Sequence, residues 1–256
     1  MEFRDLEPKD KIASGPYADV YQCGKWAVKV FKEKRPKTEV LYEALVNAEI
    51  EATGLPVPRV RDVTRLPNKQ WVIASQLVKG KTLLEIMKQD QEHLEQYVNQ
   101  MVELQLQIHA KTCPHLIKLE DRLMDRINES NDIDQTKKYE LMTVLEGMKK
   151  HQKLCHGNFS PSNIIIDNQG CPVVVDWVEA AQGNASADAA HTYLMLHLEI
   201  KEAADLYLDR FCKESHIEKQ YVQQWLPIVA AAHLKYTKNE EERDLLLHWI
   251  DVLQYQ

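Results

Sequence analysis

The chain has 256 residues, of which 44% are hydrophobic and 28% charged, as in an ordinary soluble protein of one or two domains. Its formal net charge of −7 argues against nucleic acid as the main partner and would suit a cationic small molecule. No apolar stretch suits secretion or approaches the roughly 20 residues that span a bilayer, so we expect no membrane association. The five scattered cysteines contain no C-x-x-C pair, so we expect neither disulfides nor a zinc site. This pattern predicts a protein of the reducing cytoplasm.

The first third of the chain is predicted to form a small sheet that carries one helix. Val, Tyr and Trp are frequent in the β runs, which we place at 17–31, with a turn at 23–25, and at 59–64 and 70–78. Residues 38–53 have the apolar spacing of a helix, and Gly54 suits the position just after its end. Lys79-Gly80 then makes a boundary, which gives an N-terminal lobe at 1–79.

After this boundary the pattern changes to long amphipathic helices. We expect them near 82–89, 92–111, 118–129, 134–151, 187–213 and 217–254. Residues 153–178 interrupt the series with short strand-like runs. The predicted fold class is therefore α+β, with a small antiparallel sheet lobe and a mainly helical C-terminal lobe at 80–256.

The strongest chemical signal lies in that interruption. Residues 156–163, HGNFSPSN, are followed by III at 164–166 and by VVVDW at 173–177. Phosphoryl transfer needs a group beside the acceptor hydroxyl, an oxygen ligand for Mg²⁺, and a carboxylate ligand from a neighbouring strand end. A tight loop followed by a hairpin would bring three such groups to one cleft.

This stretch resembles the H-G-D-x-x-x-x-N loop and I-D-W segment of the aminoglycoside phosphotransferase family, which includes choline-kinase-like enzymes. The resemblance implies a protein-kinase-like bilobal fold that uses ATP or GTP with Mg²⁺ to phosphorylate a hydroxylated small molecule, which could be cationic. It makes Asn163 and Asp176 the metal ligands and gives His156 the role of bracing the loop. Asn158 falls where the family carries its catalytic Asp.

A lysine between apolar residues supplies a second signal, at Ala27-Val28-Lys29-Val30. A lysine with buried neighbours needs a reason, and phosphate binding supplies one. Glu43 lies on the following helix at the spacing of the lysine–glutamate pair of kinase folds. Glu49 and Glu51 are rival partners, and the resemblance favours Glu43.

Two further segments take their meaning from the resemblance. Ser14 and Gly15 lie where a nucleotide-covering loop belongs, with backbone N–H groups near the phosphates. The segment from Gln76 through Leu77 to Val78 would be the hinge that binds the nucleotide base.

Acidic residues in the C-terminal lobe leave two questions open. Asp188 would brace the catalytic loop by resemblance, although capping a helix would explain it as well. Five other acids could line a pocket for a basic substrate or could be ordinary solvated helix positions: Asp205, Asp209, Glu241, Glu242 and Asp244.

Asn158 limits what the loop can do. An amide oxygen accepts a hydrogen bond but cannot act as a base near neutral pH, so we expect nucleotide and metal binding with much reduced turnover. The Asn could be engineered, or the natural protein could be a slow kinase or a non-catalytic nucleotide- or ligand-binding relative. These alternatives stay open at the level of sequence.

Overall fold

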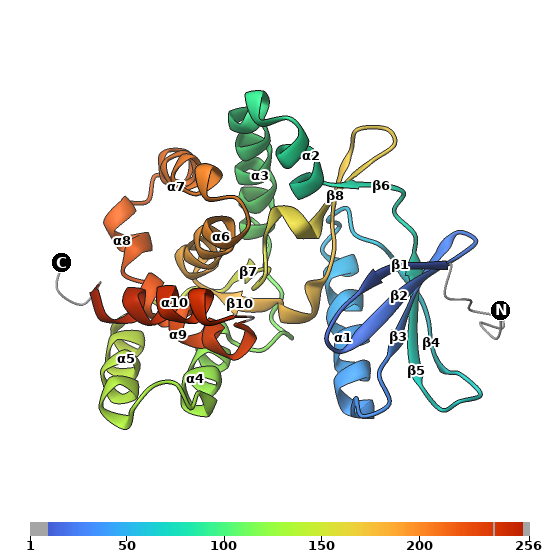
Figure 1. Cartoon of the computed structure of the whole chain (residues 1–256), viewed down its shortest axis with the longest axis horizontal. Helices are drawn as coiled ribbons and strands as arrows, with labels where there is room; N and C mark the ends of the chain where they lie inside the picture. Colours follow the sequence, from blue (N-terminus) through green and yellow to red (C-terminus); the bar gives the residue numbers. More distant parts are fainter. Residues whose placement is uncertain (1–9, 238, 253–256) are drawn as a thin grey trace. The chain divides into compact units, whose positions relative to one another are not determined.

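The computed structural model describes residues 10–237 and 239–252, which form two compact units (Figure 1). Met1–Thr82 and Ile164–Val178 make up the first, which we call the sheet unit. Leu83–Asn163 and Glu179–Gln256 make up the second, the helical unit. The division at Thr82 lies close to the predicted boundary, but the strand-rich segment Ile164–Val178, predicted for the C-terminal lobe, belongs to the sheet unit.

The sheet unit contains a five-stranded antiparallel sheet with the order β1-β2-β3-β5-β4. Its strands are β1 (Lys11–Ser14), β2 (Ala18–Cys23), β3 (Trp26–Phe31), β4 (Val60–Arg65) and β5 (Trp71–Gln76). The predicted hairpin turn after Cys23 is confirmed, with Gly24 at φ +61° where a side chain would be strained. Only β1 of these strands was not predicted.

Side-chain alternation gives this sheet two packed faces. Val28, Val30, Val72 and Ala74 form one cluster, in register across β3 and β5. The other face packs against helix α1 (Lys37–Ala52), as Figure 1 shows, and carries Lys29 toward that helix. The predicted helix is thus confirmed.

A second, three-stranded sheet with the order β6-β8-β9 completes the sheet unit. It consists of β6 (Gly80–Thr82), β8 (Ile164–Asp167) and β9 (Pro172–Val174). Gly80 pairs with Asp167, and a Cβ on Gly80 would lie 1.9 Å from the carbonyl oxygen of Ile166. The close approach of these two backbones therefore requires glycine at position 80.

The helical unit contains α2 (Leu83–Gln89), α3 (Leu94–His109), α4 (Leu119–Glu129), α5 (Gln135–Gly147), α6 (Ala185–Glu199), α7 (Lys201–Ser215), α8 (Lys219–Gln223), α9 (Leu226–His233) and α10 (Glu240–Val252). A short two-stranded sheet pairs β7 (Lys153–Cys155) with β10 (Ala181–Gly183). Helix α6 packs against α7, α8 and α9, and α9 packs against α4 and α10 (Figure 1).

Two of the predicted helices are wrong in extent. The helix predicted at 187–213 is broken at Ile200, whose non-helical backbone (φ −157°, ψ 81°) separates α6 from α7. The helix predicted at 217–254 is three helices, and Pro227, which lacks a backbone N–H, lies in the first turn of α9. Residues 253 and 254 of that prediction lie outside the described residues.

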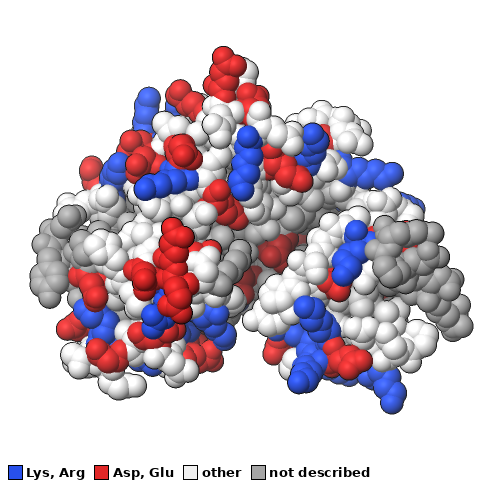
Figure 2. All heavy atoms as spheres, viewed as in Figure 1, with Lys and Arg blue, Asp and Glu red and all other residues white. Residues whose placement is uncertain are grey.

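Charges of both signs are interspersed over the helical unit on the face that Figure 2 shows. None of the helices in the described part of the chain is long and apolar enough to cross a bilayer.

The close contact at Gly80 generates a stability prediction. We expect Gly80→Ala to lower the free energy of unfolding by about 1–3 kcal/mol, because the added methyl group pushes β6 away from β8. Gly147→Ala is the matched control, since a Cβ there meets no atom within 4 Å, and it should be neutral or slightly stabilising. Urea denaturation of both variants measures this, and equal effects would contradict the packing argument.

Candidate functional site

Lys29 on β3 lies between two carboxylates in the sheet unit. Its Nζ is 2.6 Å from Oε1 of Glu43 on α1 and 3.6 Å from Oδ1 of Asp176, which follows β9. The predicted choice of Glu43 over Glu49 and Glu51 is confirmed, and the Glu51 carboxylate instead accepts a backbone N–H of β4. The sheet unit therefore presents an ammonium group held by two acids.

The electrostatics of this group keep the lysine charged. Burial lowers the pKa of Lys29, but the Glu43 and Asp176 carboxylates outweigh it and hold the pKa above its ordinary value. Asp176 has φ +63°, a left-handed conformation that costs energy in a residue with a side chain. The Asp176 side chain is 41% exposed, so its carboxylate is accessible to a further ligand.

In the helical unit, the Asp188 carboxylate on α6 holds the backbone of the predicted catalytic loop. Its Oδ1 accepts the N–H of Gly157 at 2.8 Å, and its Oδ2 accepts the N–H of His156 at 3.2 Å. The alternative, that Asp188 caps the helix, is wrong, because the N-cap is Asn184, whose side chain accepts the Ser186 N–H. Asp188 thus fixes the loop and not the helix end.

Polar side chains from α3 surround the same carboxylate. His109 Nε2 lies 2.9 Å and Gln105 Nε2 3.1 Å from Asp188 Oδ2, and the Tyr207 hydroxyl donates to Gln105. Burial alone would raise the pKa of the Asp188 carboxyl, but the hydrogen bonds from His109 and the Gly157 N–H hold it well below its usual range. Asp188 is therefore an anion inside the helical core.

Sequence reasoning missed His109 and Gln105. Both are fully or nearly fully buried, and they lie four residues apart on the predicted helix 92–111. The available signal was two polar residues at that spacing on the apolar face of the helix. This signal did not identify their partner Asp188, which is 79 positions beyond His109 in the chain.

The loop also carries hydrogen bonds of its own. The Asn158 N–H donates to Nδ1 of His156 at 3.2 Å, and Nδ2 of Asn163 donates to the Asn158 carbonyl at 2.9 Å. The Ser162 hydroxyl donates to the Glu199 carboxylate at the end of α6. The side-chain amide of Asn158 is partly exposed and bonds to none of the residues that the structure describes.

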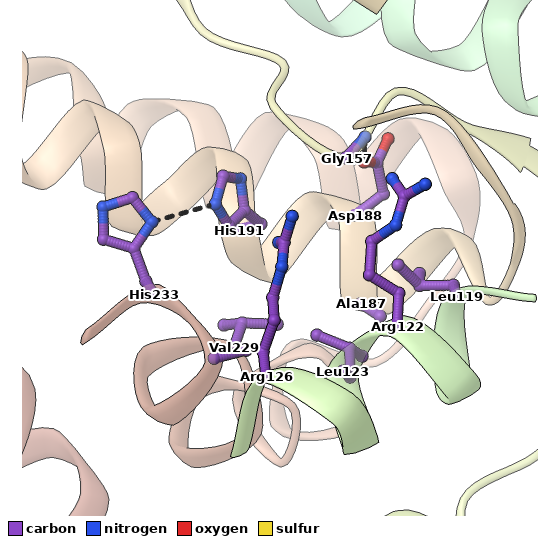
Figure 3. A pocket seen from close by; sticks show the side chains of 11 residues that line it. Leu119, Arg122, Leu123, Arg126, Gly157, Ala187, Asp188, His191, Val229 and His233 are labelled. Carbon is purple, nitrogen blue, oxygen red and sulfur yellow. Dashed lines mark hydrogen bonds between the residues drawn. The ribbon is translucent and has the colours of Figure 1, made fainter. Parts of the chain in front are cut away.

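The backbone of Glu179 packs closely against the loop at Gly157. A Cβ on Gly157, which has φ +76°, would lie 2.1 Å from the Glu179 carbonyl oxygen. Arg122 donates to that carbonyl and, at 3.1 Å, to the Glu179 carboxylate, which Arg126 also contacts. Figure 3 shows Arg122 reaching from α4 toward Asp188 and Gly157, while Arg126 extends beside His191. No motif predicted this pair, because each arginine is more than fifty residues from Glu179.

The two arginines share their pocket with a pair of histidines. The pocket measures about 20 Å³, which is enough for about one water molecule. A hydrogen bond of 3.3 Å joins Nε2 of His191 to Nδ1 of His233, drawn as a dashed line in Figure 3. His191 Nδ1 is buried without a hydrogen-bond partner among the described residues. Burial, with His233 and Arg126 nearby, lowers the pKa of His191 to about 3, so the imidazole is neutral.

Some of the backbone N–H groups predicted to contact the nucleotide already donate hydrogen bonds within the sheet unit. The Gly15 N–H donates to the Ala18 carbonyl at 2.9 Å, and the Ser14 hydroxyl donates to Asp19. In the predicted hinge, the N–H groups of Gln76 and Leu77 donate to carbonyls within the sheet unit. Val78 is the hinge residue whose N–H has no partner in the described part of the chain.

Each of the two predicted metal ligands offers an oxygen atom of the kind that a hard cation such as Mg²⁺ prefers. Asn163 uses Nδ2 within its loop, which leaves Oδ1 as a ligand atom, and Asp176 offers an accessible carboxylate. A different cluster, His109, Cys155 and Asp188, has its ligand atoms within 4.8 Å of one another. That cluster is a poor metal site, because burial raises the pKa of the Cys155 thiol and Asp188 already accepts hydrogen bonds from the loop.

Comparison with known proteins identifies the family. Residues 11–218 match the model of the phosphotransferase enzyme family. The chain belongs to this family. A search of curated proteins by sequence found no significant match.

Solved structures share the fold of this phosphotransferase-family chain. A thermostable mutant of aminoglycoside phosphotransferase APH(4)-Ia matches with a TM-score of 0.69 at 16% identity, covering 97% of this chain and 93% of that one. Aminoglycoside-3'-phosphotransferase of type VIII gives 0.62 at 17%, covering 86% and 91%. Amicoumacin kinase hAmiN gives 0.59 at 14%, covering 98% and 89%. The predicted α+β, protein-kinase-like fold class is confirmed.

The five acids that could line a pocket or be solvated helix positions lie on the surface of this phosphotransferase-family chain. Asp205 accepts a hydrogen bond from the Tyr193 hydroxyl, and Asp209 pairs with Lys219. Four of the five are exposed and Glu242 is half-buried. Their arrangement agrees with solvated helix positions.

The buried Asp188 anion generates a stability prediction. Asp188→Asn removes the charge that the loop N–H groups and His109 face, so we expect a loss of about 3–5 kcal/mol in the free energy of unfolding. Asp209→Asn is the matched control, because its exposed ion pair is worth less than about 1 kcal/mol. Urea denaturation compares the two variants. A loss of unfolding free energy in Asp188→Asn no larger than in Asp209→Asn would refute the claim that Asp188 stabilises the loop.

The neutral His191 imidazole generates a pH prediction. Its pKa of about 3 lies below the unfolded value of about 6.5, so the unfolded state binds the proton first. The free energy of unfolding should be unaffected by this group above the unfolded pKa of about 6.5. It should fall as the pH drops below that pKa, by up to about 1.4 kcal/mol per pH unit. His191→Gln should lose less stability than the wild type between pH 7.5 and 5. His248→Gln, at an exposed position, should follow the wild type, and identical curves for all three would contradict the assignment.

Proposed function

We propose that this chain is a phosphotransferase that moves the γ-phosphoryl group of ATP or GTP to a hydroxyl group of a small molecule, with turnover lowered by Asn158. The observation that carries the proposal is the Lys29 ammonium group held by Glu43 and Asp176. A charged lysine fixed in this way is suited to binding nucleotide phosphates. Membership of the phosphotransferase enzyme family supports the same activity.

The nucleotide side of the reaction is assigned mainly to the sheet unit. We propose that Lys29 contacts the phosphates, that Ser14 and Gly15 cover them, and that the hinge at Gln76–Val78 binds the base. The Val78 N–H supports the last role as the hinge donor left without a partner among the described residues. Structural neighbours are described with ADP, AMP-PNP and GDP, which supports a nucleotide of either base.

We propose Asn163 and Asp176 as the ligands of Mg²⁺. Their oxygen atoms suit this cation. When bound, the ion would neutralise charge on the nucleotide phosphates. The protein's own contribution on this side is to hold the Asn163 amide by its bond to the Asn158 carbonyl, and to hold Asp176 beside Lys29.

The acceptor side of the reaction is assigned to the loop that Asp188 and His156 brace. The acceptor hydroxyl oxygen would form a new bond to the γ-phosphorus while the bond to the nucleoside diphosphate breaks. Asn158 can accept a hydrogen bond from the acceptor hydroxyl but cannot take its proton, which would leave with solvent. Positioning without a base supports slow transfer, because the transition state depends mainly on alignment and electrostatics.

For the acceptor we propose a hydroxylated, cationic small molecule. The acidic net charge supports this, as do neighbours described with hygromycin B and kanamycin. The free state of all five cysteines supports a reducing, cytoplasmic location.

A catalytically silent nucleotide-binding protein is the second candidate. The specific observation that favours it is Asn158 itself, whose amide replaces a proton acceptor.

One experiment tests both candidates. Transfer of labelled phosphate from ATP and GTP is measured over a panel of aminoglycosides and amino alcohols, for the wild type and for Asn158→Asp. We expect Asn158→Asp to raise the rate by about 10²–10⁴, because it restores a general base. Asn168→Asp is the matched control, since it makes the same change at an exposed position, and it should leave the rate unchanged.

Thermal stabilisation by Mg²⁺ and AMP-PNP is measured on the same proteins. Stabilisation of the wild type that is lost in Lys29→Ala supports nucleotide binding. Stabilisation without transfer by either protein would favour the silent binding protein. If neither the wild type nor Asn158→Asp is stabilised, the phosphotransferase proposal is wrong.

A further inference from the structure

A second pocket lies in the sheet unit, at the end of strands β3, β4 and β5. It has a volume of about 450 Å³ and is lined by Lys25, Trp26, Arg59, Val60, Arg61, Gln76 and Leu77. Pockets that bind small molecules measure roughly 300–1,000 Å³. The hollow is therefore of the right size for a small ligand.

This pocket is separate from the Lys29 site, since neither Lys29 nor Glu43 lines it. Trp26 packs with the Val28 and Val30 cluster, and it lies directly across from Gln76 in the β3–β5 register. Lys29 alternates with these residues along β3 and faces Glu43 on α1. A ligand in the second pocket would thus not contact the Lys29–Glu43 pair.

Three cations surround the pocket without a carboxylate partner. Lys25, Arg59 and Arg61 are exposed, and none of them forms an ion pair with any acid in the part of the chain that the structure describes. Other cations of the same unit do form such pairs, as Lys11 does with Asp19 and Arg35 with Glu39. The pocket therefore concentrates positive charge in a chain whose net charge is −7.

Two of these cations are arranged around one indole ring. Lys25 Nζ lies 5.2 Å and Arg61 Cζ 5.9 Å from the centroid of the Trp26 ring, within the range of cation–π contacts. Hydrogen bonds also hold the backbone that lines the pocket, because the Leu77 N–H donates to the Lys25 carbonyl. The Gln76 N–H donates to the Arg59 carbonyl in the same way. Like charges held close together repel one another, and a bound anion would relieve that repulsion.

We propose that this pocket binds a small polyanion that carries phosphate or carboxylate groups. Guanidinium groups bind both kinds of oxyanion in a forked geometry, and three cations suit a ligand with more than one negative charge. The concave shape and the volume favour a small molecule over a protein segment. The proposal does not depend on the chain transferring phosphate.

Calorimetric titration of the full chain at low salt and without Mg²⁺ tests the proposal, with tripolyphosphate and citrate as the probes. The double variant Arg59→Gln/Arg61→Gln should bind at least about tenfold more weakly than the wild type, because it loses two charge-assisted contacts. Arg65→Gln is the matched control, since Arg65 is exposed on the same strand and stacks on Trp71 outside the pocket. It should bind within about twofold of the wild type.

The results of the titration distinguish a phosphorylated ligand, a polycarboxylate and a protein segment. Preference for tripolyphosphate would support a phosphorylated ligand, and preference for citrate a polycarboxylate. Equal affinity of wild type and double variant would overturn the proposal, and so would absence of binding by both wild type and Arg65→Gln. Tighter binding of polyglutamate than of either small anion would overturn it in favour of a protein-docking surface. Urea midpoints confirm that each variant is folded. Stabilisation by AMP-PNP, which the variants should retain, reports on the proposed function separately.

Discussion

The buried carboxylate of Asp188 is the interaction on which the site of the helical unit depends. A charge removed from water is costly unless its lone pairs are satisfied, and here donors from α3 and from the loop satisfy it. The loop N–H groups of His156 and Gly157 would otherwise be buried donors without partners. The loop conformation and the core therefore stabilise each other, and neither depends on the side chain at position 158.

The residues proposed for nucleotide and metal binding differ in charge between the two units. The sheet unit contributes the Lys29 ammonium group and the Asp176 carboxylate. The loop of the helical unit contributes the neutral amides of Asn158 and Asn163. In the proposed function, the charged groups assigned to phosphate and Mg²⁺ are therefore Lys29 and Asp176, and the neutral amide of Asn158 is not one of them. This separation is the physical reason to expect nucleotide binding to persist when acceptor activation is weak.

Local patterns predicted the parts of the site that are encoded locally. The hairpin of β2 and β3, helix α1 and the pair of Lys29 with Glu43 follow from strand composition, helical spacing and a short connection. The brace on Asp188 was recognised only as one of two alternatives, because a carboxylate in a first helical turn can also cap. The N-cap at Asn184 decides between them, and that bond depends on backbone geometry.

Contacts between distant segments could not be predicted in this way. Arg122 and Glu179 are separated by 57 positions, and nothing in their neighbouring sequence indicates that they meet. The same holds for Gly157, whose need for glycine comes from the Glu179 carbonyl beside it and not from its own turn alone. The break at Ile200 also escaped prediction, since apolar spacing continues across it while the backbone does not.

Position 158 can therefore be considered apart from the rest of the loop. Its backbone N–H and carbonyl are both bonded within the loop, to His156 and Asn163, and these bonds do not involve the side chain. Asn and Asp have nearly the same shape, and the Asn158 amide bonds to no other described residue. Exchange between the two would therefore change the charge and basicity of one partly exposed group while leaving the loop geometry in place. A difference in rate between them would report on proton transfer and local charge, whereas a difference in nucleotide binding would show that the charge at this position acts on the phosphates as well.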